Sequence, residues 1–92
     1  MSNKTAQFAN IYCAREAVKL LEDYPDGMTA RGLIGALIDR KVKWSWCILP
    51  RGLTNELSNL EDAGGGVHSA FVNRCTVWRH DKYKAEEEQT ND

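Results

Sequence analysis

The chain has 92 residues and a mass of 10.4 kDa, which is the length of one domain and excludes a two-domain enzyme. Hydrophobic residues make up 42% of the chain and charged residues 27%, close to the average of folded globular domains, so we expect one packed core. No apolar run approaches the roughly 18 residues that a membrane helix requires, and residues 1–5 lack an apolar secretory segment. We therefore expect a cytoplasmic protein without membrane contact.

The net charge of −1 hides an asymmetry along the chain. Four of the thirteen acidic residues lie among the last seven residues, where there is no base, so residues 1–84 carry twelve bases and nine acids, a net charge of +3. This balance falls short of the isoelectric point above about 9 that by itself argues for nucleic-acid binding. Residues 82–92 have too little apolar surface to offset the entropy of ordering. We expect a domain over residues 1–81 and a disordered acidic tail after it.

The side chains most often used in metal sites and catalysis do not form a recognisable group. Cys13, Cys47 and Cys75 match neither a disulfide framework nor a zinc pattern, and we expect reduced, partly buried thiols. His68 and His80 have no third partner at ligand spacing. No Cys or Ser pairs with a His and a carboxylate in a known arrangement. We predict no metal, no cofactor, no catalytic residue and no enzymatic activity.

Residues 6–21 place apolar side chains at steps of three and four, which predicts a first helix with one apolar stripe. We expect this helix to end near Asp23, because Tyr24 precedes Pro25 and a residue before proline is pushed out of the helical region. Pro25 and Gly27 then predict a turn, since proline presets φ and glycine permits a positive φ. The stripe consists of Phe8, Ile11, Ala14, Val18 and Leu21, and Tyr12, Ala17 and Leu20 widen it.

Thr29 predicts the N-cap of a second helix, which ends at Arg40 and Lys41, where cations favour a helix C-terminus. Residues 42–48 are short and rich in β-branched and aromatic side chains. We interpret them as a connector that carries Trp44 and Trp46 into the core. The apolar stripe of the second helix comprises Ala30, Leu33, Ile34, Leu37 and Ile38.

A third helix is predicted over residues 50–63. Pro50 suits its first position, because the missing N–H would be unpaired there anyway, and the glycines at 64–66 end the helix at a C-cap. The leucines that define its buried side follow at steps of four, four and three: Leu49, Leu53, Leu57 and Leu60.

Two strand-like segments, residues 67–72 and 75–79, flank Asn73 and Arg74. This pattern predicts a β-hairpin, since Asn tolerates the left-handed turn conformation. Pairing around the turn leaves open which sheet face points inward, because both are apolar. One face carries Val67, Phe71 and Trp78, and the other carries Ala70, Val72, Cys75 and Val77.

Residues 57–67 read LSNLEDAGGGV. This stretch resembles the winged helix-turn-helix family, in which Leu, two polar residues, Leu, an acid, Ala and Gly lead from the recognition helix into the first strand of the wing. The order of elements over residues 6–80 is similar as well, although the chain lacks the Cys or His clusters of metal-sensing members. The resemblance implies an α+β fold, mainly α, with three helices and a C-terminal hairpin wing.

The polar side of the third helix is the candidate base-reading face. At 100° per residue, five of its side chains fall within about 80° of one direction, opposite the leucines. Asn pairs with adenine edges, Ser and Thr bond to bases or phosphates, and Arg suits guanine or the backbone. An ordinary solvated helix face is the alternative interpretation. The five residues are Arg51, Thr54, Asn55, Ser58 and Asn59.

Basic residues flank this helix at positions suited to phosphate contacts. Lys41 and Lys43 precede the helix, and Arg74 and Arg79 lie on the expected hairpin. Solvated surface charge is the alternative for all four.

Two hypotheses from different classes follow. The first is a bacterial or phage DNA-binding transcription regulator, in which the third helix enters the major groove of double-stranded DNA and the hairpin over residues 67–79 touches the backbone or minor groove. One such domain makes few contacts, so site-specific binding requires a homodimer or a cooperative partner. We expect the first helix, with Tyr12 and Cys13, to supply that interface.

The second hypothesis is a winged-helix protein-interaction module, encoded by a phage or plasmid, that binds a host protein and no DNA. The acids on the third helix, Glu56, Glu61 and Asp62, and the acidic tail favour it.

Overall fold

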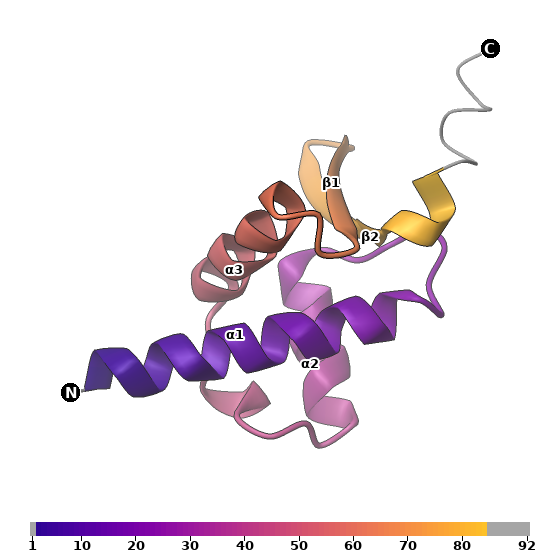
Figure 1. Cartoon of the computed structure of the whole chain (residues 1–92). Helices are drawn as coiled ribbons and strands as arrows, with labels where there is room; N and C mark the ends of the chain where they lie inside the picture. The colour runs from indigo at the N-terminus through magenta and orange to yellow at the C-terminus, as the bar shows by residue number, and fades with distance from the viewer. Residues whose placement is uncertain (1, 85–92) are drawn as a thin grey trace, which may run out of the picture.

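The computed structural model describes residues 2–84, and the side chains of residues 7–84. It confirms an α+β architecture, mainly helical, in which three helices precede an antiparallel hairpin (Figure 1). The predicted acidic tail lies outside the described residues from position 85 onward. In chain order the elements are α1 (Ser2–Leu21), α2 (Ala30–Asp39), the 3-10 turn η1 (Ser45–Cys47), α3 (Pro50–Asp62), β1 (Val67–Val72), β2 (Cys75–His80) and the 3-10 turn η2 (Asp81–Tyr83).

The buried side of α1 differs from the predicted stripe. Ala14, Ala17, Leu20 and Leu21 are buried as expected, but Phe8 and Tyr12 are exposed. Two small residues outside the predicted stripe, Ala9 and Cys13, face the core instead. Small side chains allow a neighbouring helix to approach closely, and α3 packs directly against this side of α1. The prediction that Cys13 lies at an exposed interface is therefore wrong.

The environment of Cys13 has a chemical consequence. Its Sγ lies 3.5 Å from the backbone oxygen of Lys43. Burial, followed by the nearby Cys47 and Glu16, raises the pKa of the Cys13 thiol from its ordinary 9.0 to about 11. The thiol is thus neutral and packs as a small hydrophobic group. The prediction of partly buried thiols is wrong for Cys47 and Cys75, which are exposed.

The turn after α1 and the N-cap of α2 follow the sequence prediction. Gly27 has a φ of +76°, and the Thr29 hydroxyl accepts a hydrogen bond of 3.1 Å from the Gly32 N–H. Between them, Met28 pairs with Trp78 of β2 through two backbone hydrogen bonds. This one-residue bridge attaches the hairpin to the loop between α1 and α2, so β2 is paired on both edges.

The connector after α2 places its tryptophans differently from each other. Trp44 is half-buried against the ring of Tyr12, with the ring centroids 5.6 Å apart, whereas Trp46 is 71% exposed. A 3-10 turn has three residues per turn, so side chains two positions apart cannot face the same way. The prediction that both tryptophans enter the core is wrong for Trp46.

The third helix begins at Pro50, as predicted, and ends at Asp62, one residue before the predicted end. Pro50 occupies its first turn, and at the other end Gly65 N–H donates to Leu60 O at 2.7 Å while Gly64, with a φ of +71°, donates to Glu61 O. This pair of bonds is a Schellman cap.

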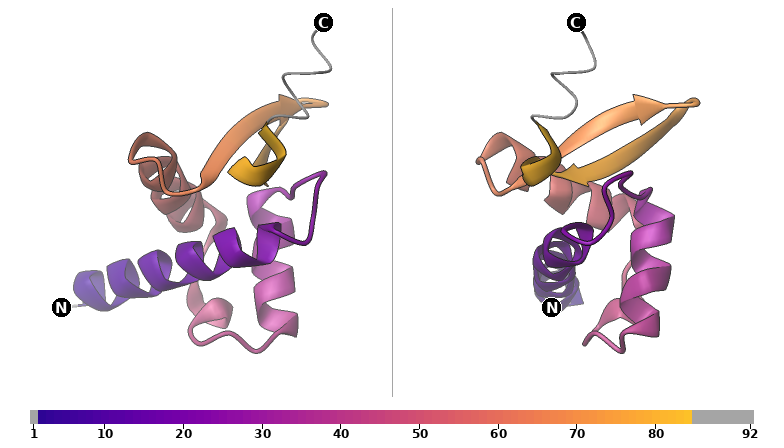
Figure 2. Two further views of the ribbon diagram at one scale, coloured as in Figure 1. Left: turned by 45° about the vertical axis from the view of Figure 1, so that its right-hand side comes forward. Right: turned by 90° about the vertical axis from the view of Figure 1, so that its right-hand side faces the viewer.

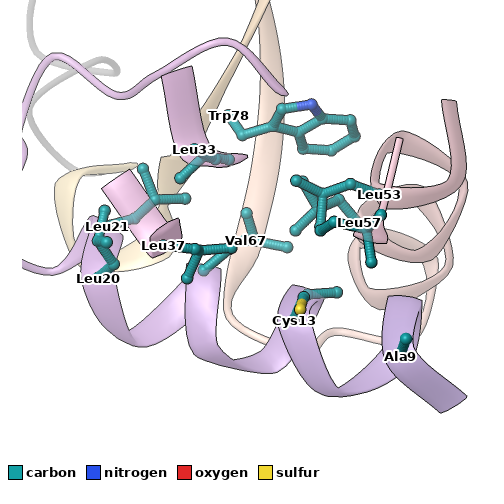
Figure 3. Close-up of a cluster of buried hydrophobic side chains, with 13 residues drawn as sticks. Ala9, Cys13, Leu20, Leu21, Leu33, Leu37, Leu53, Leu57, Val67 and Trp78 are labelled. Atoms are coloured by element: carbon teal, nitrogen blue, oxygen red, sulfur yellow. The ribbon is translucent and has the colours of Figure 1, made fainter. Parts of the chain in front are cut away.

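The leucines of α3 anchor it, with one exception. Leu53 and Leu57 are fully buried and Leu60 is half-buried, but Leu49 lies before the first turn and is exposed. Figure 3 shows Leu53 and Leu57 converging with the side chains of α1, α2 and the hairpin on one core.

The hairpin turns at Asn73 and Arg74, as predicted. Both residues have positive φ, 51° and 68°, which is the type I′ geometry of two-residue hairpins. The register pairs Ser69 with Trp78 and Phe71 with Thr76, so the face that carries Val67, Phe71 and Trp78 is confirmed as one face. Val67 and Trp78 of this face are buried, and the distal half of the hairpin projects from the helices (Figure 2).

The chain after β2 packs back on the domain. His68 Nδ1 lies 2.7 Å from Asp81 Oδ1, and the Tyr83 hydroxyl donates to the backbone oxygen of Glu22. Tyr83, which was predicted to belong to the disordered tail, is thus bonded through η2 to the turn that follows α1.

Candidate functional site

The polar side of α3 is open to solvent. Arg51, Asn55, Ser58 and Asn59 are exposed and Thr54 is half-buried, while Leu53 and Leu57 on the opposite side are buried. We call the four exposed residues the outward face of α3. The structure therefore brings all five predicted base-reading residues together on one side of one helix.

Asn59 has a second environment at the border of the outward face. A groove of about 270 Å³ runs between α1 and α3, and Asn59 lines it together with Arg15, Glu56 and Leu60. Nearby, α1 and α3 approach so closely that a Cβ at Gly52 would lie 2.6 Å from Asn10 Nδ2. Asn59 therefore lies where the open side of α3 meets α1.

The three acids of α3 occupy different positions. Glu56 lines the groove beside α1. Glu61 accepts hydrogen bonds of 3.1 Å from both the N–H and the hydroxyl of Ser69, so its charge is used to join α3 to β1. Asp62 is exposed at the last turn of α3. None of the four residues of the outward face is acidic, but Asp62 lies on the same side of α3, one turn after Ser58.

The Glu61–Ser69 contact also protects the sheet edge. The backbone N–H and C=O of Trp78 bond to Met28 and not to Ser69, its partner in the register. Ser69 and Trp78 are therefore a non-hydrogen-bonded pair, and the Ser69 N–H points to the open edge of β1. Glu61 accepts from that N–H. An unpaired edge donor is therefore capped, and the hairpin is held at a fixed position beside α3.

The predicted basic residues fall into two groups. Arg74 is exposed at the hairpin turn, while Arg79 is half-buried at the hairpin base, where its Cγ would lie 2.7 Å from a Cβ at Gly27. Lys41 and Lys43 are exposed in the loop after α2, at the end of the domain opposite the hairpin (Figures 1 and 2). The structure does not bring these two lysines together with the hairpin.

Lys41 and Lys43 both contact residues close to them in the sequence. Lys41, with a φ of 58°, donates its N–H to Ile38 O and ends α2 in the left-handed conformation usual for glycine. The Lys43 ammonium lies 4.5 Å from the centroid of the Trp44 ring, a cation–π contact.

Sequence reasoning missed two exposed residues on elements that pack against α3. Arg31, in the first turn of α2, is exposed and lines a shallow hollow with Ile34, Ile48 and Pro50, so it adds a base at the N-terminal end of α3. Phe71, on the distal part of β1, is exposed. The sequence placed Arg31 on a helix and Phe71 on a strand. Only the packing of α2 and β1 against α3 shows that these two elements lie next to the third helix.

Charge is distributed unevenly around this site. Residues 40–55 contain four bases and no acid, and residues 63–80 contain two arginines, two histidines and no acid. The connector, the N-terminal half of α3 and the whole hairpin therefore carry only neutral or basic side chains. Because the connector and the hairpin lie at opposite ends of the domain, they form two separate regions without acids, and in the first of them Arg40 lies 4.0 Å from the carboxylate of Asp23. Each region attracts a polyanion.

Comparison of the chain with protein-family models, with curated proteins and with solved structures finds no match in any of the three. Within residues 2–84, no three His, Cys, Asp or Glu side chains are grouped so that they could hold a metal ion. No helix in the same part of the chain has the length and apolar character needed to cross a membrane.

Proposed function

We propose that the protein is a DNA-binding regulator of winged helix-turn-helix type, bacterial or phage-borne and cytoplasmic. In this proposal α3 enters the major groove, and the β1–β2 hairpin contacts the neighbouring backbone or minor groove. The observation that carries the proposal is the outward face of α3, on which small hydrogen-bonding side chains are exposed between a basic N-terminal end and an acid-free hairpin.

Three of the four residues of that face have roles that their chemistry suits. Asn55 offers a donor and an acceptor that match an adenine edge, and Ser58 bonds to a base or a phosphate. Arg51, one turn before Asn55, reaches guanine or the backbone. Arg31, beside the start of α3, and Arg74, in the hairpin turn, are suited to phosphates. The helix reads bases in this arrangement, and the arginines set its position.

One domain of this size presents few contacts, so we propose that the protein binds its site as a homodimer or with a cooperative partner. Aromatic side chains on α1 and the connector are available for that association. Phe8, Tyr12 and Trp46 are exposed, and Tyr12 contacts Trp44. We call these four residues the aromatic patch. It lies on elements other than α3 and the hairpin, so association there leaves the outward face open.

Base preference tests the assignment of roles. Binding of the full chain to a selected duplex and to a random duplex is measured by fluorescence anisotropy. Asn55→Ala removes a base contact and lowers the ratio of the two affinities by about 5- to 150-fold. Arg74→Ala weakens binding to both duplexes alike. Lys19→Ala, which removes an exposed base of α1 paired with Glu16, is the matched control and changes neither.

The outcomes separate the roles clearly. Equal effects of Asn55→Ala on specific and random DNA contradict base reading by α3. Absence of binding to any duplex at low salt contradicts the proposal as a whole.

The aromatic patch also supports the second candidate function, a module that binds a host protein and no DNA. Exposed aromatic side chains such as Phe8, Tyr12 and Trp46 are typical of protein interfaces. Under this alternative the chain recovers one stoichiometric protein and no nucleic acid from host lysate, and Trp46→Ala abolishes that recovery. Recovery that persists with Trp46→Ala but is lost with Asn55→Ala would contradict a role for the patch.

A further inference from the structure

Phe71 is the most exposed of the large apolar side chains that the structure describes, at 76%. Folding leaves its ring in water, so core packing gives no reason for an aromatic residue at this position. Its cross-strand partner on β2 is the exposed Thr76, so no large side chain lies directly opposite the ring. The aromatic ring is thus available for a function outside the fold.

The register fixes the side of the hairpin on which Phe71 lies. Ser69, Phe71, Thr76 and Trp78 share one face. Trp78 of that face is buried among the helices, and Ser69 is bonded to Glu61 of α3. Phe71 follows two residues further toward the tip. It therefore lies on the face that looks toward the helices, in the part of the hairpin that extends past them (Figure 2).

The position of Phe71 relative to α3 is held by contacts at both edges of the hairpin. Glu61 ties β1 to the last turn of α3, and the Met28 bridge ties β2 to the loop before α2. The tight turn at Asn73 and Arg74 closes the other end. Because the hairpin is short and is attached at both edges, the position of the Phe71 ring relative to the outward face of α3 is fixed.

The charge of the hairpin indicates the chemistry of the partner. Residues 63–80 have no acid, and Arg74 is exposed three residues after Phe71. Phe71 and Arg74 together suit a partner that combines negative charge with flat apolar surfaces. A DNA duplex has the charge in its phosphates and the flat surfaces in its stacked bases. Proteins that bind the minor groove insert apolar wedges such as Phe between base steps and kink the duplex by about 20–90°.

We propose that Phe71 inserts between two adjacent base pairs from the minor groove while Arg74 contacts the flanking phosphate, so that binding bends the DNA. This inference rests on the proposed function, and it adds an activity to it: the protein changes the shape of its site as well as reading its sequence. The bend also brings more of the duplex toward the protein, which compensates for the small size of the domain.

Bending is measured by energy transfer between dyes at the two ends of a duplex of about 30 base pairs, which is short compared with the persistence length. Binding is followed separately by anisotropy. Phe71→Ala abolishes the bend and weakens binding by about 5- to 150-fold, the range for loss of one aromatic–base stack. Phe71→Leu keeps an apolar wedge and retains most of the bend. Val72→Ala, on the opposite face of β1, is the matched control and leaves the bend unchanged.

The readouts distinguish the failure of this inference from that of the proposed function. If wild-type protein binds the duplex, and Phe71→Ala bends it equally with unchanged affinity, the wedge is refuted while DNA binding stands. If wild-type protein binds no duplex at low salt, both proposals fail. Thermal melting of Phe71→Ala confirms that the fold is intact, because the removed ring is exposed and such changes alter stability by at most about 0.5 kcal/mol.

Discussion

Substitution of Gly27 by alanine tests how the hairpin is attached to the helices. Gly27 has a φ of +76°, and a Cβ there would lie 2.5 Å from the backbone oxygen of Trp78 and 2.8 Å from Val77 Cγ1. The left-handed conformation costs a residue with a Cβ about 1–2 kcal/mol. Relief of the overlap requires the Met28–Trp78 bridge to move, and its two hydrogen bonds contribute about 1–3 kcal/mol together.

We therefore expect Gly27→Ala to lower the free energy of unfolding by about 2–5 kcal/mol, a large part of the roughly 5–14 kcal/mol available to a chain of this length. The melting temperature falls by about 10–30 °C. Urea denaturation followed by tryptophan fluorescence measures the change, since Trp78 lies at the bridge.

Two further glycines supply controls for the same substitution. Gly64 has a φ of +71°, and a Cβ at this position would meet no atom within 4 Å, so Gly64→Ala isolates the conformational cost of about 1 kcal/mol. Gly35 lies in α2 with open space around it, and Gly35→Ala stabilises the protein by about 0.5–1 kcal/mol. If Gly27→Ala destabilises no more than Gly64→Ala, the close approach of the turn to β2 is refuted.

Three other predictions address the core, the thiols and the hairpin contact. Leu57→Ala costs about 2–5 kcal/mol in urea denaturation, whereas Leu49→Ala, from the same sequence stripe but exposed, stays within about 0.5 kcal/mol; equal costs would contradict the orientation of α3. At pH 8 the buried Cys13 reacts with Ellman's reagent more slowly than the exposed Cys47. Because folding raises the pKa of Cys13 from 9.0 to about 11, the unfolded state releases its proton first, and stability falls as pH rises between those values; a flat profile relative to Cys13→Ala would contradict this burial. Glu61→Ala increases hydrogen exchange at the strand amide that it caps, and unchanged exchange would show that the contact does not form in solution.

Local chemistry made much of the fold predictable. Pro25 and Gly27 marked the first turn, Asn73 marked the hairpin, and the steps of Leu53 and Leu57 marked the buried side of α3; each of these signals acts over a few residues. The face of α1 could not be chosen in the same way. Apolar side chains lie on more than one side of α1, and the close approach of α3 is what buries Ala9 and Cys13 and leaves Phe8 exposed.

The candidate site was predictable as a helix face but not as a surface. The period of α3 places Arg51, Asn55 and Ser58 on one side whatever the rest of the chain does. Distances between elements could not be predicted in this way. The loop that contains Lys41 lies shortly before α3 in the sequence, but it is at the opposite end of the domain from the hairpin. Arg31, more distant in sequence, lies beside the start of α3.

The most direct test of the central claim is an NMR titration of the full chain with a short duplex at low salt, in which the backbone amide signals report where DNA binds. We predict that the amides of α3 around Asn55 and Ser58 and those near Arg74 shift together, and that the amides of Phe8 and Tyr12 on α1 do not. Shifts confined to α1 and the connector, or no shifts at all, would contradict the assignment of the outward face of α3 as a DNA-reading surface.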